Sequence, residues 1–473
     1  MYDRMQELSS KDIGAIHDVS MSILSETGIV FKDEKAVETF KKHGFKVNEN
    51  TVFFTEKQVQ TALESCPSRF TVTARNPEKR VDVGGDDFVF APGYGAPFIV
   101  TEDGEHREAT MEDYDNFCKL VHTSAFMDMN GFMMVEPSDV PAATAHLDMI
   151  RSNILLSDKP FMGAPVSRQG SIDCAGMLEL VWGKEAEEKT FTVSLINSLS
   201  PLAFSGEMAA SLMELANRNQ ACIIAALIMA GTSGPITIAG VLAQQNAEIL
   251  AGITLAQLVR KGAPVVYGST SAPTDMRTGG LSIGAAELSI IVACTAQMAR
   301  YYNLPCRSGG CLTDSHVPDA QAGAQSCMAL MTAARNGVNF ILHAAGILGS
   351  YIGMSYEKYL IDEELCGMAR TLIGDVPVNE NTLQREVIHR VGPGGQFLAE
   401  METLERCRTE FFFPTLMVTK DHAMWKEEGM VWAHDHATEL LKKRLASYEK
   451  PPVDEGLEKS LDDFVKKVKA ERA

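Results

Sequence analysis

The sequence has few basic residues for its length, and it has no long apolar run. It carries 43 Lys and Arg residues against 62 Asp and Glu residues, a formal net charge of -19 at pH 7. This excess of negative charge argues against nucleic acid or an anionic membrane as the main partner. The longest apolar runs, such as residues 221–230, are far too short to span a bilayer. The first residues also lack the apolar core of a signal peptide.

The ten cysteines do not have the spacing of a disulfide framework, which predicts a reduced, cytoplasmic protein. Cys306 and Cys311 are the only pair near a predicted site. Structural zinc usually needs four closely spaced ligands and catalytic zinc needs three. We therefore expect no zinc.

Helices and short apolar strands alternate from about residue 110 onward. Seven strand-and-helix units are expected, with strands near residues 129–135, 160–163, 190–196, 222–228, 264–267, 305–307 and 339–342. A further strand within residues 88–100 would complete eight. Alternating units of this kind imply parallel strands with right-handed crossovers. No G-x-G-x-x-G fingerprint opens the first unit, so the run of eight predicts an α/β fold of the closed (β/α)8 TIM barrel type.

The chain is longer than the roughly 250 residues of a typical barrel of this kind, so additional segments are expected. We predict an α-rich N-terminal extension over residues 1–80, the barrel over 81–374 and a helical appendage packed on it over 375–473. The appendage has expected helices at 400–409 and 424–448. Its apolar FFFP segment is either a cap on the barrel, which we favour, or a dimer contact.

The predicted carboxyl ends of the strands lack the groups that several enzyme classes require. Lys159, Lys189 and Lys261 precede strands and so fall on the opposite rim, which argues against a Schiff-base aldolase. No cluster of carboxylates and histidines suggests a metal site. One histidine, His343, ends a strand and opens into the glycine-rich stretch AAGILGSY. It is either an active-site residue or a buried histidine bonded to backbone.

Three other side chains could take part in binding. Arg307 could hold a substrate carboxylate, or it could pair with acidic residues in the following loop. Tyr94 lies between two glycines, and Tyr351 follows the His343 strand, as does Tyr356. An aromatic ring over a cation contributes about 0.5–2 kcal/mol, and quaternary ammonium recognition commonly uses it. Ordinary packing is the alternative for each tyrosine.

Several segments together resemble the trimethylamine methyltransferase (MttB) superfamily. They are APGYGAP (91–97), GGCLTDSHVPDAQAG (309–323), FILHAAGILGS (340–350) and VGPGGQFL (391–398). Members of this family are β/α barrels that pass a methyl group from a methylamine to the cobalt of a separate corrinoid protein. The trimethylamine enzymes contain pyrrolysine, whereas this chain has only standard residues, so it resembles the non-pyrrolysine branch. The resemblance implies a cytoplasmic methyltransferase that acts on a quaternary amine such as glycine betaine or proline betaine.

The resemblance also implies roles for the candidate residues. Tyr94 and Tyr351 would surround the ammonium group, while His343 and Arg307 would hold the carboxylate. No residue acts as acid, base or nucleophile, because cobalt(I) of the corrinoid partner is itself the nucleophile. Relatives often have His-Thr-Leu after the GPGG segment, where this chain has Glu402. Alternatives are a carnitine or other quaternary amine demethylase and a non-catalytic betaine-binding barrel. A homo-oligomer is expected.

Overall fold

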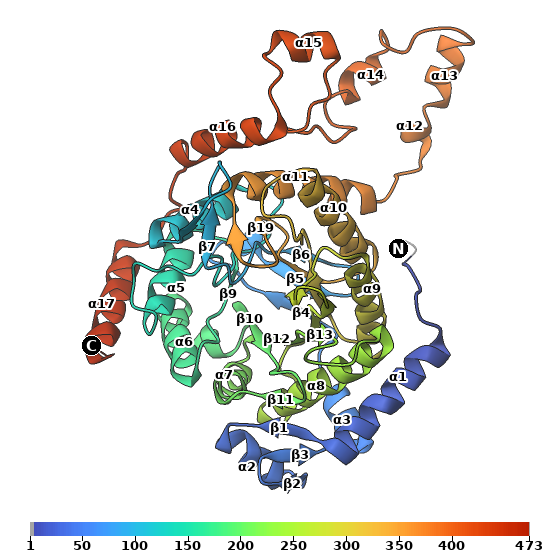
Figure 1. Ribbon diagram of the computed structural model, residues 1–473. Coiled ribbons are helices and arrows are strands. Elements are labelled where there is room, and N and C mark those ends of the chain that lie inside the picture. Colours follow the sequence, from blue (N-terminus) through green and yellow to red (C-terminus); the bar gives the residue numbers. More distant parts are fainter. Residues whose placement is uncertain (1–3, 473) are drawn as a thin grey trace.

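The computed structural model describes residues 4–472 and centres on one parallel sheet (Figure 1). Seven strands pair in the order β6-β18-β17-β14-β12-β10-β9, and every pairing is parallel. The strands are β6 (Val89–Phe90), β9 (Phe161–Met162), β10 (Thr192–Asn197), β12 (Ala221–Ala226), β14 (Val265–Ser269), β17 (Cys306–Gly309) and β18 (Phe340–Leu342). The predicted α/β class with a parallel sheet is confirmed.

Helices lie around this sheet (Figure 1). They are α4 (Met111–Thr123), α5 (Ala145–Leu156), α6 (Arg168–Trp182), α7 (Gly206–Asn217), α8 (Ile238–Val259), α9 (Ala286–Tyr301), α10 (Ala320–Arg335) and α11 (Tyr356–Ile373). Six of them begin after a Ser, Thr or Asp whose side chain accepts a backbone hydrogen bond from the first turn. Such caps stabilise a helix start by about 1 kcal/mol. Between residues 4 and 472, no helix combines the length and the apolar character that crossing a membrane requires.

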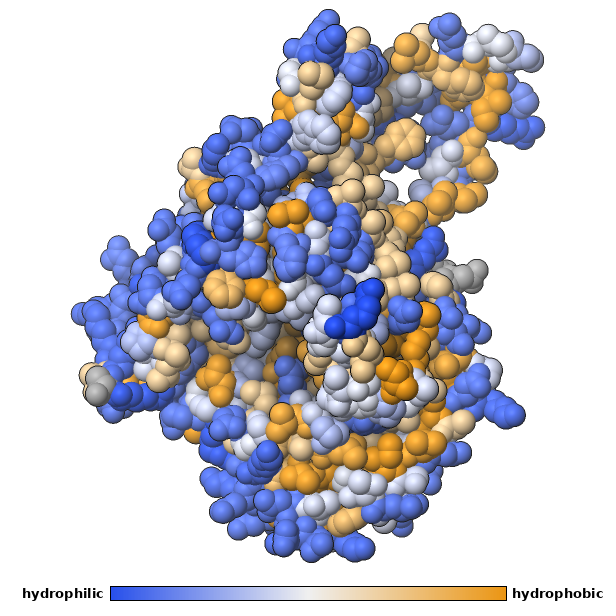
Figure 2. Space-filling model, viewed as in Figure 1, coloured by the Kyte–Doolittle hydropathy of each residue, from blue (hydrophilic) through white to orange (hydrophobic). Residues whose placement is uncertain are grey.

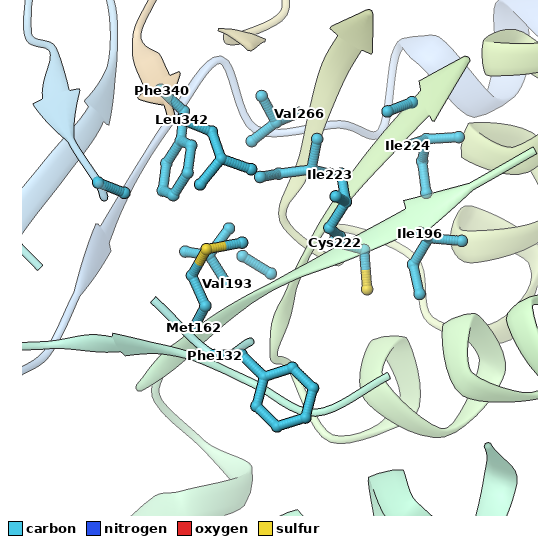
Figure 3. Packing of buried hydrophobic residues seen from close by; sticks show 14 of the residues in the cluster. Phe132, Met162, Val193, Ile196, Cys222, Ile223, Ile224, Val266, Phe340 and Leu342 are labelled. Carbon is cyan, nitrogen blue, oxygen red and sulfur yellow. The ribbon is translucent and has the colours of Figure 1, made fainter. Parts of the chain in front are cut away.

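The inner face of the sheet is packed with apolar side chains. Residues paired between parallel strands point to the same face, and the register aligns Ile223 with Val266 and Phe340 with Val89. Figure 3 shows Phe340, Leu342 and Ile223 converging with Val193 and Met162 from other strands. This side of the sheet is therefore a filled core.

The expected strand over residues 129–135 is wrong in extent. Asp128 N donates to Phe90 O at 3.0 Å, and Asn130 forms a parallel bridge with Phe161, but no longer strand follows. The chain bends over residues 132–134, and Met133 O instead accepts from Gly95 N at 2.6 Å. This segment pairs with the 91–97 loop because its backbone groups find partners there.

The stretch 88–100 also differs from one continuous strand. β6 belongs to the parallel sheet, whereas β7 (Phe98–Val100) pairs with β8 (His106–Glu108) and with β20 (Gly353–Met354), next to β19 (Ile347–Leu348). Proline and glycine residues at 92–97 interrupt the strand, since proline lacks an N–H and glycine favours turns. Another small sheet contains β13 (Met229–Ala230), β15 (Ala272–Asp275) and β16 (Gly280–Leu281).

The N-terminal segment combines helices with short strands. It contains helices α1 (Ser10–Ser22), α2 (Glu34–Lys42) and α3 (Glu56–Leu63), strands β1 (Ile29–Phe31), β2 (Lys46–Asn48) and β3 (Thr51–Phe53), and a hairpin of β4 (Arg69–Val72) and β5 (Val81–Gly84). β1 pairs in parallel with β11 (Ala203–Phe204), which follows β10. The small sheet formed by β1, β2 and β3 is thus joined to the main body through β11.

The C-terminal segment has two parts. Helices α12 (Glu380–Leu383), α13 (Arg385–Val391), α14 (Met401–Arg406) and α15 (His422–Glu427) extend away from the body, beyond the ring of helices in Figure 1. Helices α16 (Ala433–Ala446) and α17 (Glu455–Arg472) return to it, α16 against α11 and α4, and α17 against α5 and α6.

Two expectations for this segment are wrong. The helix expected over 424–448 is interrupted, because Gly429 and Met430 both adopt positive φ angles of 91° and 56°, outside the helical region. The FFFP segment is not a cap, since Phe411 and Phe413 are exposed and only Phe412 turns inward, with its ring 6.0 Å from that of Phe126.

Candidate functional site

Arg307 lies in β17, on the inner face of the sheet. The register aligns it with Gly268 of β14 on one side and Phe340 of β18 on the other. Arg307 is only 1% exposed, and the single hydrogen bond found for it among the described residues goes from Nη1 to Ser269 O at 3.3 Å. Its Nε has no partner.

No carboxylate within residues 4–472 forms an ion pair with Arg307. The two acidic residues considered from the sequence have other partners. Asp314 accepts hydrogen bonds from Ile283 N, Gly284 N and Ser350 Oγ, while Asp319 accepts from Ala322 N and caps α10. Burial lowers the pKa of Arg307 to about 10, so the side chain stays charged at neutral pH. A buried, unpaired cation is costly for a protein unless a ligand supplies the counter-charge.

His343 follows β18 and is held by backbone contacts with the glycine-rich loop of residues 91–97. Its N–H donates to Pro92 O at 3.1 Å, and Ala344 N donates to Ala91 O at 2.9 Å. Its carbonyl accepts from Cys311 N at 2.8 Å. These contacts link the loops after β6, β17 and β18. His343 also adopts a φ of 58°, uncommon for a side chain of this size.

The imidazole of His343 is neutral. Burial and the positive charge of Arg307 lower the pKa of His343 well below its usual value. Its Nδ1 is buried without a hydrogen-bond partner. The alternative of a fully satisfied core histidine is therefore not supported by the hydrogen bonding.

Tyr351 lies against His343, with ring centroids 4.8 Å apart at 49°. Its φ of 78°, like the 56° of Ser350, is in the left-handed region, where tertiary contacts must compensate the strain. Ser350 supplies such a contact through Asp314. Burial raises the pKa of Tyr351, and its hydroxyl has no partner among the described residues.

Tyr94 is half-buried on the 91–97 loop, with its ring 6.4 Å from that of Phe132. The phenol interacts electrostatically with Arg307, and burial is the main cause that raises its pKa. Gly93 permits this loop to approach closely, because a Cβ there would lie 2.7 Å from Met354 Sδ and 2.9 Å from Ile347 Cδ1.

Other candidates lie elsewhere. The Tyr356 ring stacks on Phe117 at 4.6 Å, and its hydroxyl donates to Asp113 Oδ1 at 2.7 Å, which gives it a structural role. Glu402 pairs with Arg390 at 3.0 Å in the extended C-terminal segment.

Residues 4–472 contain no group of three or more His, Cys, Asp or Glu side chains that could hold a metal ion. Cys306 and Cys311 are separate buried thiols, and Cys311 is hydrogen-bonded to Cys366. Phe132, beside Tyr94, was not singled out from the sequence. The only signal for it was its position in an expected strand.

The structure thus brings Tyr94, Arg307, His343 and Tyr351 together, with interacting charges and unpaired polar atoms. The chain matches the trimethylamine methyltransferase (MTTB) family over residues 1–473. It belongs to the MttB family. The methyltransferase assignment predicted from the sequence motifs is confirmed.

Several relatives of this MttB family member carry curated names. It is 44% identical to "Glycine betaine methyltransferase" of Desulfitobacterium hafniense, over 97% of this chain and 96% of the relative. It is 31% identical to "Proline betaine:corrinoid methyltransferase" of Eubacterium limosum, over 95% and 94%. Among solved structures, monomethylamine methyltransferase (MtmB) of Methanosarcina barkeri aligns with a TM-score of 0.47 and 12% identity, over 91% of this chain and 98% of that one.

Proposed function

We propose that this protein transfers a methyl group from a betaine to the cobalt(I) of a separate corrinoid protein and leaves a tertiary amine. Glycine betaine is the first substrate to test. The names and identities of the glycine betaine and proline betaine relatives support this choice. A relative of Eubacterium limosum named "L-carnitine:corrinoid methyltransferase", at 28% identity, makes carnitine a second candidate.

The observation that carries the proposal is the unpaired charge of Arg307. Arg307 is 1% exposed, and its side chain has one hydrogen bond to backbone and no acidic partner among residues 4–472. A betaine carboxylate would supply both the counter-charge and the missing acceptors. Arginine donates hydrogen bonds in a planar fork that matches a carboxylate.

The aromatic residues would receive the other end of the substrate. Tyr94 and Tyr351 are neutral phenols that both interact electrostatically with Arg307. A ring face attracts a quaternary ammonium group, which cannot form conventional hydrogen bonds. His343 would contact the carboxylate through its unpartnered Nδ1 as a neutral hydrogen-bonding group. Arg307 would then provide the positive charge, and both residues would keep the carboxylate-holding role expected from the sequence.

The reaction requires no proton transfer by the protein. The partner's cobalt(I) is a strong nucleophile, and it receives the methyl group as the C–N bond breaks. The electron pair of that bond stays on nitrogen, so a quaternary ammonium leaves as a neutral tertiary amine without a proton. The protein's contribution is to position the methyl group and exclude water. The half-buried tyrosines and the neutral His343 suit these tasks.

We further propose that the sheet closes into a (β/α)8 barrel through residues 128–130. The contacts of Asp128 with Phe90 and of Asn130 with Phe161 on the two edge strands support this closure. Residues 1–80, 81–374 and 375–473 would form the extension, the barrel and the appendage. The ten free cysteines support a cytoplasmic location.

The test is methyl transfer to cob(I)alamin, followed by the absorbance change to methylcob(III)alamin. We expect turnover with glycine betaine or a related betaine and none with trimethylamine. Trimethylamine lacks the carboxylate, and demethylation of the neutral amine would have to release a dimethylamide anion. Tetramethylammonium, which lacks the carboxylate, should be a much poorer substrate. Absence of methylation with every quaternary amine would refute the proposal, whereas binding without turnover would favour a non-catalytic betaine-binding barrel.

A further inference from the structure

The extended C-terminal segment, residues 375–432, here called the arm, exposes an unusual amount of apolar surface. Half of the 28 large hydrophobic side chains exposed within residues 4–472 lie in it, each at least 44% exposed. They include Val376, Leu398, Leu404, Phe411 and Trp432. Figure 2 shows apolar residues gathered on this projecting part. A soluble monomer rarely exposes an apolar patch of more than about 300–600 Å².

The arm cannot cover this surface by itself. Val387 and Leu416 are its only buried hydrophobic residues in the described chain, and α12, α14 and α15 bury none. Its internal contacts are mainly exposed ion pairs, such as Arg390 with Glu400 and Lys420 with Glu428. Exposed pairs of this kind contribute little to stability. The observed shape of the arm therefore requires a surface outside its own fold.

The arm is nevertheless firmly attached to the body at its C-terminal end. Glu364 of α11 accepts hydrogen bonds from Leu416 N at 2.8 Å and Met417 N at 2.9 Å. Phe412 packs against Phe126, whereas Phe411 and Phe413 on either side of it face outward. The apolar surface continues onto the end of α11, where Leu372 is 56% exposed.

The size and composition of this surface indicate a permanent partner. A stable interface uses about 20–30 residues per side, and obligate homo-oligomeric interfaces are the larger and more apolar ones. The arm alone has more residues than that. A corrinoid protein that delivers and removes cobalt must dissociate between turnovers, so it suits a smaller and more polar contact. That comparison rests on the proposed function.

The position of the arm also favours a partner other than the corrinoid protein. A corrinoid partner must approach the loops at the carboxyl ends of the strands, where His343 and Tyr351 lie. Figure 1 shows the arm leaving the ring of helices sideways, beyond α10 and α11. It therefore extends from the side of the molecule.

We propose that the arm is the contact surface for a second copy of this chain. In a two-fold dimer each copy would contribute the same arm and receive its partner's, so both apolar surfaces would be covered in a closed assembly. Leu398 and Leu404, 85% and 65% exposed, are central to this contact.

The experiment is sedimentation equilibrium of the full chain with no other protein present. We expect an oligomer for the wild type, and the variant L398D/L404D should raise the dissociation constant at least about 30-fold. The matched control V19D/L180D changes two exposed residues on α1 and α6, outside the arm, and should not alter assembly. A monomeric wild type at about 10 µM, well above the dissociation constant of a stable dimer, would overturn the proposal. So would an oligomer that L398D/L404D leaves intact.

A second measurement guards against misfolding of the variant. Cys407 is an exposed thiol on the arm, and Cys327 is an exposed thiol on α10. Maleimide labelling of Cys407 should be slower in the wild-type oligomer than in L398D/L404D. The change in labelling rate between the two proteins should be several-fold larger for Cys407 than for Cys327. Equal labelling rates of Cys407 would overturn the proposal, as would protection that arises only when the corrinoid protein is added. None of these readouts needs methyl transfer, so failure of the proposed activity would leave them interpretable.

Discussion

Lys358 and Arg307 are the most deeply buried lysine and arginine side chains within residues 4–472, but their surroundings differ. Lys358 of α11 is 1% exposed and forms an ion pair with Asp362 one turn later, and its Nζ also donates to Ser326 Oγ at 2.8 Å. Asp362 in turn accepts from Gly346 N at 2.9 Å. Arg307 is equally buried, yet it has one backbone contact and no acidic partner among residues 4–472.

We interpret this difference as that between a structural charge and the binding charge that we propose for Arg307. A buried ion pair that is fully hydrogen-bonded is close to neutral for stability as a unit, but removal of one member is costly. Arg307 has no such member to lose, so its charge costs stability that a bound anion can return. Perturbed, incompletely paired groups of this kind concentrate at functional sites.

The largest effect is expected from breaking the structural pair. Asp362→Ala leaves Lys358 charged and unpaired, and should lower the free energy of unfolding by about 3–5 kcal/mol. Urea denaturation measures this change. The double variant Lys358→Met/Asp362→Leu removes both charges and should recover most of the loss. A single variant as stable as the wild type would mean that the pair is not buried as described.

Arg307→Met should have the opposite effect: a large loss of activity without a loss of stability. We expect kcat/KM for glycine betaine to fall at least 30-fold, because losing one partner of a buried charge pair costs about 2 kcal/mol or more. Stability without substrate should be unchanged or higher, since an unpaired buried charge is removed. Methylcobalamin formation and urea denaturation on the same samples give both values. A destabilised variant with normal kinetics would place Arg307 with Lys358 as a structural residue.

The proton affinity of His343 tests the combined effect of its burial and of the Arg307 charge on its pKa. Because the pKa of His343 is depressed in the folded protein, the unfolded chain binds the proton more tightly. The contribution of His343 to stability is therefore complete above about pH 6.5. It is lost at up to about 1.4 kcal/mol per pH unit below that value.

We expect His343→Asn to lose less stability than the wild type between pH 7 and pH 5, as measured by urea denaturation at each pH. Asparagine tolerates the positive φ at this position better than most residues. Parallel pH profiles for the two proteins would show that His343 is not held neutral by its surroundings.

The smallest effect concerns the aromatic residues. Tyr351→Leu should weaken binding of glycine betaine by about 0.5–2 kcal/mol through the lost cation–π contact. Tyr356→Leu is the matched control, because Tyr356 stacks on Phe117 and bonds Asp113 away from the site. Isothermal titration calorimetry with the two variants distinguishes them, and equal affinities would assign Tyr351 to packing.

Most of the parallel sheet was predictable, because short apolar strands alternating with helices allow few topologies. The errors lie where backbone groups find partners far away in sequence. Residues 133–136 bond to the 91–97 loop instead of extending a strand, and β7 pairs with β20. Neither pairing has a local signal, since each depends on how the loops above the sheet meet.

The sequence by itself determined the parallel α/β class, the family and the four candidate side chains, because periodicity, strand ends and motifs are local properties. Only the tertiary structure decided what surrounds each candidate. It separated Tyr351 from Tyr356, made His343 neutral and left Arg307 without a counter-charge from any residue between 4 and 472. The physical reason is that burial and charge pairing are set by residues distant in the chain, such as Gly268 beside Arg307 and Asp113 beside Tyr356.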